Sequence, residues 1–209
     1  MGTEIVSMNV DQRILDYFED HVMRFGLNSF TVDRMAKELK MSKRTVYRRF
    51  PNKPSIVNAA VERLKYRLDQ HFLAMAKKEG RPAQLLMLTI NGVLDTLTPF
   101  INQSIADLKQ SYPEIWHSLE IYRFEKFNHL FQLMRQAQKD GDINPNLNLD
   151  RLATLLPLIM DHLFQPEVVF HPAHASRDMV NEVFMILFQG IFTGEMRDSL
   201  PQLLNKKST

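Results

Sequence analysis

Eight basic side chains gather between Thr31 and Lys53, where only Asp33 and Glu38 oppose them. With eight cations and two anions this segment has a net charge of +6, against +2 for the whole chain, which leaves −4 for the remaining residues. A basic patch on an otherwise acidic chain is the electrostatic pattern of a protein that binds a polyanion. The basic residues are Arg34, Lys37, Lys40, Lys43, Arg44, Arg48, Arg49 and Lys53.

Two short amphipathic helices are predicted within this segment, separated by Lys40, Met41 and Ser42. Thr31 caps the first helix, and its apolar residues follow at helical spacing: Val32, Met35, Ala36 and Leu39. Ser42 caps the second helix, which turns Val46 and Phe50 inward and leaves mainly basic residues outside. This arrangement predicts a helix-turn-helix whose second helix enters the major groove of DNA. The alternative interpretation is a solvated basic face on an ordinary helical hairpin.

Other residues could carry different chemistry. His171 and His174 could bind a metal with Asp161 or His162, but they lie in a predicted loop, and the chain has no cysteine. Asp161, His162 and Ser176 are the elements of a catalytic triad, but adjacent residues on a helix point apart and no nucleophile motif is present. We therefore expect no metal, no cofactor and no catalytic residues, so that the chain is not an enzyme.

The elements around this segment are predicted to be helical throughout, because apolar residues recur about every 3.6 positions and no long alternating segment indicates a strand. We therefore predict an all-α protein. The expected helices span residues 10–25, 32–39, 43–50, 54–78, 83–97, 102–109, 113–139, 150–164 and 177–197. Pro54 fits the first turn of the long fourth helix, and Pro157 is expected to kink the helix that contains it.

The order and spacing of seven residues match a known signature: Ala36, Ser42, Thr45, Val46, Tyr47, Phe50 and Lys53. Together with Thr31 and the first helix, they resemble the DNA-binding head of the TetR family of regulators, whose pattern is commonly written A…GVSxGTLYxYFxxK. The remainder of the chain resembles this family in architecture: the total length, the long helix opened by proline, and two apolar helices at the end.

The resemblance implies a role for each matching residue. Thr31 and Ser42 would cap helices and bind phosphates, whereas Tyr47 would touch phosphate or a thymine methyl group, and Lys53 would bind phosphate. The DNA-binding residues are then Thr31, Ser42, Lys43, Arg44, Thr45, Tyr47, Arg48, Arg49 and Lys53. Glycine is usual at positions 40 and 44, and Tyr or His at 49. Lys40 would hold a left-handed backbone at a cost, while Arg44 and Arg49 add charge and predict a steep salt dependence.

The resemblance also implies a carboxy-terminal domain that binds a small molecule and dimerises through its last two long helices. Residues 150–164 are apolar on nearly every side, so part of this helix should cover a partner. The predicted dimer interface consists of Leu156, Leu163, Val183, Leu187, Gly190 and Ile191, and Gly190 with Gly194 could allow close helix approach. The predicted ligand contacts are Trp116, Tyr122, His129 and His162, of which Trp116 and Tyr122 are preferred, and Asn91 is a further candidate.

These interpretations predict a helix-turn-helix head over residues 1–53 and a helical ligand-binding and dimerisation domain over 54–209. The expected function is ligand-responsive repression by a homodimer on a pseudo-palindromic operator. Two alternatives stay open: an activator or nucleoid-associated factor without an effector, and a helical module that binds an acidic protein. No apolar run spans a membrane and no signal peptide is recognisable, so we expect a cytoplasmic protein whose partners are double-stranded DNA, a second copy and a small effector.

Overall fold

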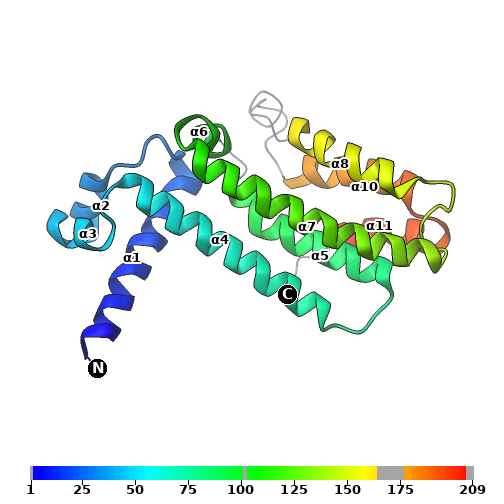
Figure 1. Cartoon of the computed structure of the whole chain (residues 1–209), viewed down its shortest axis with the longest axis horizontal. Helices are drawn as coiled ribbons and strands as arrows, with labels where there is room; N and C mark the ends of the chain where they lie inside the picture. Colours follow the sequence, from blue (N-terminus) through cyan, green and yellow to red (C-terminus); the bar gives the residue numbers. More distant parts are fainter. Residues whose placement is uncertain (1, 101–102, 164–176, 206–209) are drawn as a thin grey trace. The chain divides into compact units, whose positions relative to one another are not determined.

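A computed structural model describes residues 2–100, 103–163 and 177–205, with side chains over 10–100, 104–159 and 182–202. In these ranges every regular element is a helix, apart from an isolated bridge between Ile143 and Phe192, which confirms the predicted all-α class. The helices are α1 (Gly2–Phe25), α2 (Val32–Glu38), α3 (Lys43–Arg49), α4 (Lys53–Ala76), α5 (Pro82–Leu97), the 3-10 turn η1 (Thr98–Phe100), α6 (Gln103–Ser111), α7 (Pro113–Lys139), α8 (Leu149–Leu163), α10 (Arg177–Ile191) and α11 (Gly194–Asn205) (Figure 1). Within the same ranges, no single helix is long and apolar enough to cross a membrane, and one bent pair, residues 82–100 with 104–111, passes by length and composition alone.

The chain divides into two compact units. The first combines residues 1–66 with residues 100–119, and the second combines residues 67–99 with residues 120–209. The helix-turn-helix segment therefore shares its unit with α6 and the first turns of α7. This division differs from the functional boundary expected between residues 53 and 54, which stays a prediction.

The core of the first unit is formed by one apolar stripe from each helix. Ile14, Phe18 and Val22 project from α1 at intervals of four residues, as a buried helix face requires. Phe30, from the loop before α2, meets Phe18 edge to face with ring centroids 4.8 Å apart. The cluster is completed by Leu27, Val32, Met35, Ala36, Val46, Phe50, Ile56, Val57, Ala60, Val61 and Leu108.

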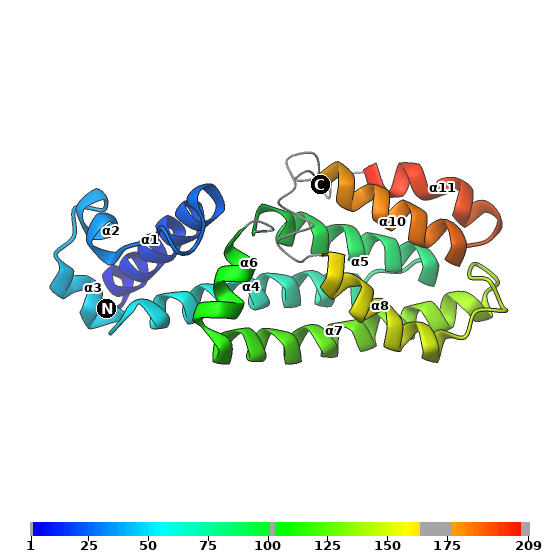
Figure 2. The ribbon, with the colours of Figure 1, turned by 90° about the horizontal axis from the view of Figure 1, so that it is seen from above.

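The second unit is built around α5, whose buried residues cover most of its circumference. Figure 2 shows α11 beside α10 and α5, and all three contribute to one core. Its largest fully buried side chains are Leu86, Met87, Met134, Ile143, Phe192 and Leu200. On α5, Gly92 is required by packing, because a Cβ there would lie 2.0 Å from the His71 ring of α4. The histidine thus occupies the space that a larger residue would need.

The prediction of one final helix over residues 177–197 is wrong, because the chain turns between α10 and α11. Backbone groups at the turn bond to the loop after α7: Asn144 N–H donates to the Ile191 carbonyl (2.9 Å), and Thr193 N–H donates to the Asp142 carbonyl (2.9 Å). Gly194 then opens α11 with a φ of +49°. Gly190 and Gly194 therefore do not share a helix, and a Cβ on Gly190 would meet open space, so this spacing gives no close helix approach within the chain.

Candidate nucleic-acid interface

The two short helices of the predicted motif are capped by the expected side chains. Thr31 has extended backbone, and its hydroxyl accepts a hydrogen bond from Arg34 N–H at 3.3 Å. Ser42 does the same for α3, accepting from Thr45 N–H at 3.0 Å, while its hydroxyl also lies 2.9 Å from Thr45 Oγ1. Each cap satisfies a backbone donor that the first turn of a helix leaves without a partner. Both predicted caps are confirmed.

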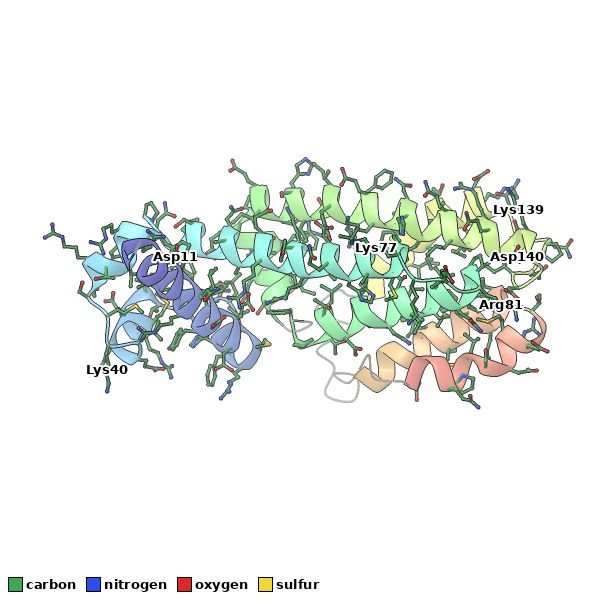
Figure 3. All side chains as sticks on the ribbon, turned by 90° about the horizontal axis from the view of Figure 1, so that it is seen from below. Asp11, Lys40, Lys77, Arg81, Lys139 and Asp140 are labelled. Carbon is green, nitrogen blue, oxygen red and sulfur yellow. The ribbon has the colours of Figure 1, made fainter. Side chains whose placement is uncertain are left out.

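The turn between α2 and α3 has the geometry that usually requires glycine. Met41 N–H donates to the Ala36 carbonyl (2.9 Å) and Lys40 N–H to the Lys37 carbonyl (3.2 Å), which is the paired bonding of a Schellman ending. Lys40 lies at its left-handed position with a φ of +52° and is the sole non-glycine residue with positive φ among those described. The usual turn is therefore kept despite the lysine, whose side chain points away from the motif (Figure 3).

The outer face of α3 presents polar side chains that the first unit does not use. Val46 and Phe50 face inward and are buried, so the positions between them face outward. Tyr47 is 44% exposed, and the side chains of Arg44 and Arg48 are exposed without an ion pair in the part of the chain that the structure describes. Two free guanidinium groups beside a phenol can bind phosphate oxygens and base edges in the major groove.

Two other predicted DNA-binding cations are paired within the chain. Lys43 Nζ lies 2.6 Å from Asp33 Oδ2, in a pair whose side chains are 58% and 65% exposed. Arg49 donates from Nε to Asp11 Oδ1 at 2.6 Å and from Nη2 to Asp11 Oδ2. These carboxylates reduce the positive charge offered to DNA, and the sequence alone did not indicate either pair.

Lys53 lies at the start of α4 and binds backbone carbonyls. Its ammonium group donates to the carbonyls of Phe30 (2.9 Å) and Leu27 (3.3 Å), and it lies 5.7 Å from the centre of the Phe30 ring. Burial lowers the pKa of Lys53, against the opposing charge of Asp107. In this structure Lys53 joins α4 to the loop between α1 and α2, and its predicted phosphate contact stays a prediction.

The same loop is held by residues that sequence reasoning missed. Asp107 of α6, only 4% exposed, accepts from both the backbone N–H (3.1 Å) and the side-chain amide (2.7 Å) of Asn28. His21 of α1 lies 2.9 Å from the Ser29 hydroxyl, with its ring edge against Phe30. Burial lowers the pKa of His21, and the positive charge of Arg34 lowers it further. No signal in the sequence singled out Asp107, because Lys109 lies two residues further on and the partner Asn28 is 79 positions away.

The predicted ligand contacts are divided between the two units. Trp116 packs against the core of the first unit, and its buried indole nitrogen has no hydrogen-bond partner among the described residues. Tyr122 and His129 belong to the second unit: Tyr122 donates to Asp69 Oδ1 at 2.9 Å, and the His129 ring lies 5.6 Å from that of Phe72. Burial and the Asp69 hydrogen bond raise the pKa of Tyr122. Asn91 is buried on α5, and the side chain of His162 lies outside the described residues.

The predicted interface residues differ in burial, and two of the six lie in the core of the second unit. Leu156 and Ile191 are buried there, Val183 and Leu187 are half-buried, Gly190 is exposed, and the side chain of Leu163 lies outside the described residues. The apolar side chains that α8 and α10 do expose are others: Leu155 (54%), Leu158 (60%), Ile159 (40%) and Ile186 (72%). Figure 1 shows α8 and α10 on the same side of α5 within this unit. Among the described residues no cluster of three potential metal ligands occurs, and His171 and His174 are not described.

Comparisons with known proteins agree with this geometry. Residues 22–60, which contain α2 and α3, match the family model "Bacterial regulatory proteins, tetR family". The HTH-type transcriptional regulator YvaF of Bacillus subtilis (strain 168) is 22% identical over 196 residues, covering 91% of this chain and 100% of that protein. A TetR-family transcriptional regulator from Marinobacter aquaeolei VT8 has a TM-score of 0.74 at 17% identity, covering 95% of this chain and 98% of that one. A transcriptional regulator from Saccharomonospora viridis, solved in complex with choline, has a TM-score of 0.69 at 20% identity, covering 90% and 100%.

The helix-turn-helix with its free basic face defines a DNA-binding protein of the transcription-regulator class. More particularly, residues 22–60 carry the DNA-binding region of the TetR family, and the curated relative and the solved structures are similar to this chain over most of its length. Proteins of this family are DNA-binding transcription factors and not enzymes, which agrees with the expectation from the sequence.

Proposed function

We propose that this regulator is a cytoplasmic repressor that binds a pseudo-palindromic operator as a homodimer and releases it when a small molecule binds. The observation that carries the proposal is the outer face of α3, where Arg44, Tyr47 and Arg48 are exposed and the two arginines have no ion pair among the described residues. Arginine binds guanine bidentately in the major groove, so these side chains supply both affinity and base preference.

The proposed dimer interface is the exposed apolar surface of α8 and α10, defined by Leu155, Leu158, Ile159 and Ile186. Removing apolar surface from water contributes roughly 25 cal/mol per Å², which must exceed the entropic cost of association. A symmetric pair of chains would present two copies of α3 to half-sites about one turn of DNA apart, which is why the operator is expected to be pseudo-palindromic.

The proposed effector site lies in the second unit. One similar structure was solved with choline, and another, at a TM-score of 0.66 and 16% identity, is a gamma-butyrolactone receptor, so proteins of this fold hold small organic molecules. Tyr122, His129 and Asn91 are the described polar candidates for ligand contacts. The effector would act by its higher affinity for a conformation that binds DNA weakly, and could shift the equilibrium only by that difference in affinity.

A selection of genomic fragments with the purified protein, repeated at two salt concentrations, tests this function. A shared pseudo-palindrome retained at the higher salt is the expected result, and an Arg44→Ala/Arg48→Ala double variant that keeps its helical circular dichroism should not enrich it. Fragments without a common motif, released together by salt, would indicate a nucleoid-associated factor. Absence of DNA binding by the folded protein would instead favour a module for an acidic protein partner.

The effector is tested separately by native mass spectrometry of protein purified from its own cells. A retained small molecule that lowers affinity for the recovered operator in titrations supports repression relieved by ligand. A compound that raises operator affinity would contradict the proposed direction, and the absence of any retained or DNA-releasing compound across a metabolite extract would favour a regulator without an effector.

A further inference from the structure

We propose that Arg49 is a positioning residue, held by Asp11 so that the recognition helix α3 keeps its orientation, and that it is not a phosphate contact. This inference rests on the proposed reading of DNA by α3. It also changes the DNA-binding role that the sequence analysis predicted for Arg49.

The Arg49–Asp11 pair is a bidentate ion pair with a fixed geometry. Two donors of the Arg49 guanidinium, Nε and Nη2, meet the two carboxylate oxygens of Asp11, so the planar groups lie fork to fork. The side chains are 35% and 32% exposed, and the two residues are 38 positions apart. A bidentate, half-buried pair loses more on breaking than an exposed one, because both planar groups must be solvated again and reoriented.

The Lys43–Asp33 pair provides the contrast. It is a single contact from a flexible ammonium group, with side chains that are 58% and 65% exposed. Water competes well at such a site, and Lys43 can exchange its carboxylate for a DNA phosphate at little cost. The cations available to DNA on α3 are therefore Lys43, Arg44 and Arg48.

The short helix α3 depends on contacts with other helices to keep its orientation. It has seven residues, too few to be stable by itself, and its outer face carries only solvated side chains. Ser42 fixes its start, and Val46 fixes its inner face. Its last turn is tied to α1 by Arg49 and Asp11, the latter labelled on α1 in Figure 3.

A second contact from α1 reaches the end of α2, before the turn that leads to α3. Arg13 donates from Nη2 to the carbonyl of Leu39, the last residue of the α2 ending, at 3.0 Å. Asp11 and Arg13 thus hold the ends of α3 and α2 respectively. The first helix therefore sets the angle at which α3 presents Arg48, the neighbour of Arg49.

The test measures operator affinity by fluorescence anisotropy over a series of KCl concentrations, with the duplex recovered in the genomic selection as the probe. Asp11→Asn, Arg49→Lys and Arg49→Gln should each weaken binding about fivefold without changing the salt slope, because each removes orientation and not a phosphate contact. The exchange Asp11→Arg with Arg49→Asp should recover most of this loss. Every variant is compared by circular dichroism and thermal unfolding.

Two matched controls separate charge from position. Asp33→Asn also removes one carboxylate charge from the first unit but frees Lys43, so it should tighten binding. Arg48→Ala should weaken binding and reduce the salt slope by about one, as the loss of a phosphate contact does.

If the exchanged pair does not fold, the amide hydrogen exchange of Phe50 in Asp11→Asn serves instead. The Phe50 N–H donates to the Val46 carbonyl (2.8 Å) at the end of α3, and its exchange should accelerate when Asp11 no longer holds Arg49.

Asp11→Asn binding as tightly as wild type or tighter, together with a reduced salt slope for Arg49→Gln, would overturn the inference and make Arg49 a phosphate contact. An unchanged Phe50 exchange rate in Asp11→Asn would overturn it as well. Failure of the proposed function would give results distinct from these: no operator would be recovered, or Arg48→Ala would leave operator affinity unchanged.

Discussion

Helices α3 and α8 both expose side chains that their own units do not use, but of opposite kinds. The outer face of α3 carries Arg44, Tyr47 and Arg48, whereas that of α8 carries Leu155 and Leu158. Charged groups are well solvated in water, and they bind a polyanion with an affinity that depends on the salt concentration. Large exposed apolar side chains are typical of a surface that is buried in a protein–protein interface. On the proposed function, α3 would bind DNA reversibly, and α8 would form part of a lasting interface with a second copy.

The largest predicted effect comes from placing a charge on the apolar face of α8. Leu158→Glu would bury an unpaired carboxylate between two copies, and we expect the dimer to dissociate roughly a hundredfold more readily. Operator affinity should fall with it, because a single head reads only one half-site. Sedimentation equilibrium measures the first effect and anisotropy the second.

Phe124→Glu is the matched control, since Phe124 is 64% exposed but lies on α7. It should leave the dimer intact, and Ile186→Glu on α10 should behave like Leu158→Glu. A dimer that survives both Leu158→Glu and Ile186→Glu would show that the exposed apolar residues of α8 and α10 do not form the interface, and the contrast between α3 and α8 would then fail.

The next largest effect concerns the free arginines of α3. Arg44→Ala and Arg48→Ala should each lower operator affinity about tenfold and reduce the salt slope by about one, while the dimer persists. Anisotropy on the operator and on a scrambled duplex distinguishes base reading from phosphate binding. Equal losses on both duplexes would assign these side chains to the backbone alone.

A smaller effect compares two turns with the same bonding, one in each unit. Lys40 and Gly141 both hold the left-handed position after a helix, with φ of +52° and +85°. Lys40→Gly should stabilise the first unit by about 1 kcal/mol, and Gly141→Ala, which meets no neighbour within 4 Å, should destabilise the second by a similar amount. Urea unfolding measures both, and a destabilising Lys40→Gly would refute the backbone argument.

The smallest effect is the response of the first unit to acid. The pKa of His21 is lowered by burial and by Arg34, so the folded state favours the neutral ring. Neutral His21 makes its full contribution to the free energy of unfolding above the pKa of the unfolded state, about 6.5. This contribution is lost as the pH falls from that value to the lower pKa of the folded state. Urea unfolding at pH 7 and pH 5 should show a smaller loss of stability in His21→Gln than in wild type; an equal loss would exclude His21 as the cause.

The sequence was sufficient for features that depend on neighbours a few residues away. The Thr31 and Ser42 caps each act over three residues, and the bounds of α7 follow from Pro113 and the Asp140–Gly141 ending. Features that depend on distant partners escaped it. The Asp11–Arg49 pair spans 38 positions, and the break before Gly194 is made by backbone groups of residues 142–144.

The orientation of α8 escaped prediction for a different reason. This helix is apolar on nearly every side, so its periodicity could not decide that Leu156 faces the core while Leu155 and Leu158 face outward. Tyr122 and His129 were reasonable ligand candidates by residue type, but Trp116 packs in the first unit, which no helical period could reveal.

The central claim is that two copies joined through α8 and α10 read one operator with two copies of α3. A hydroxyl-radical footprint of the wild-type protein on the recovered duplex tests it most directly. The predicted result is two protected regions related by two-fold symmetry, with centres about 10 base pairs apart or a multiple of that spacing, and the loss of both at matched concentration for Leu158→Glu. A single asymmetric protected region that Leu158→Glu leaves unchanged would contradict the claim.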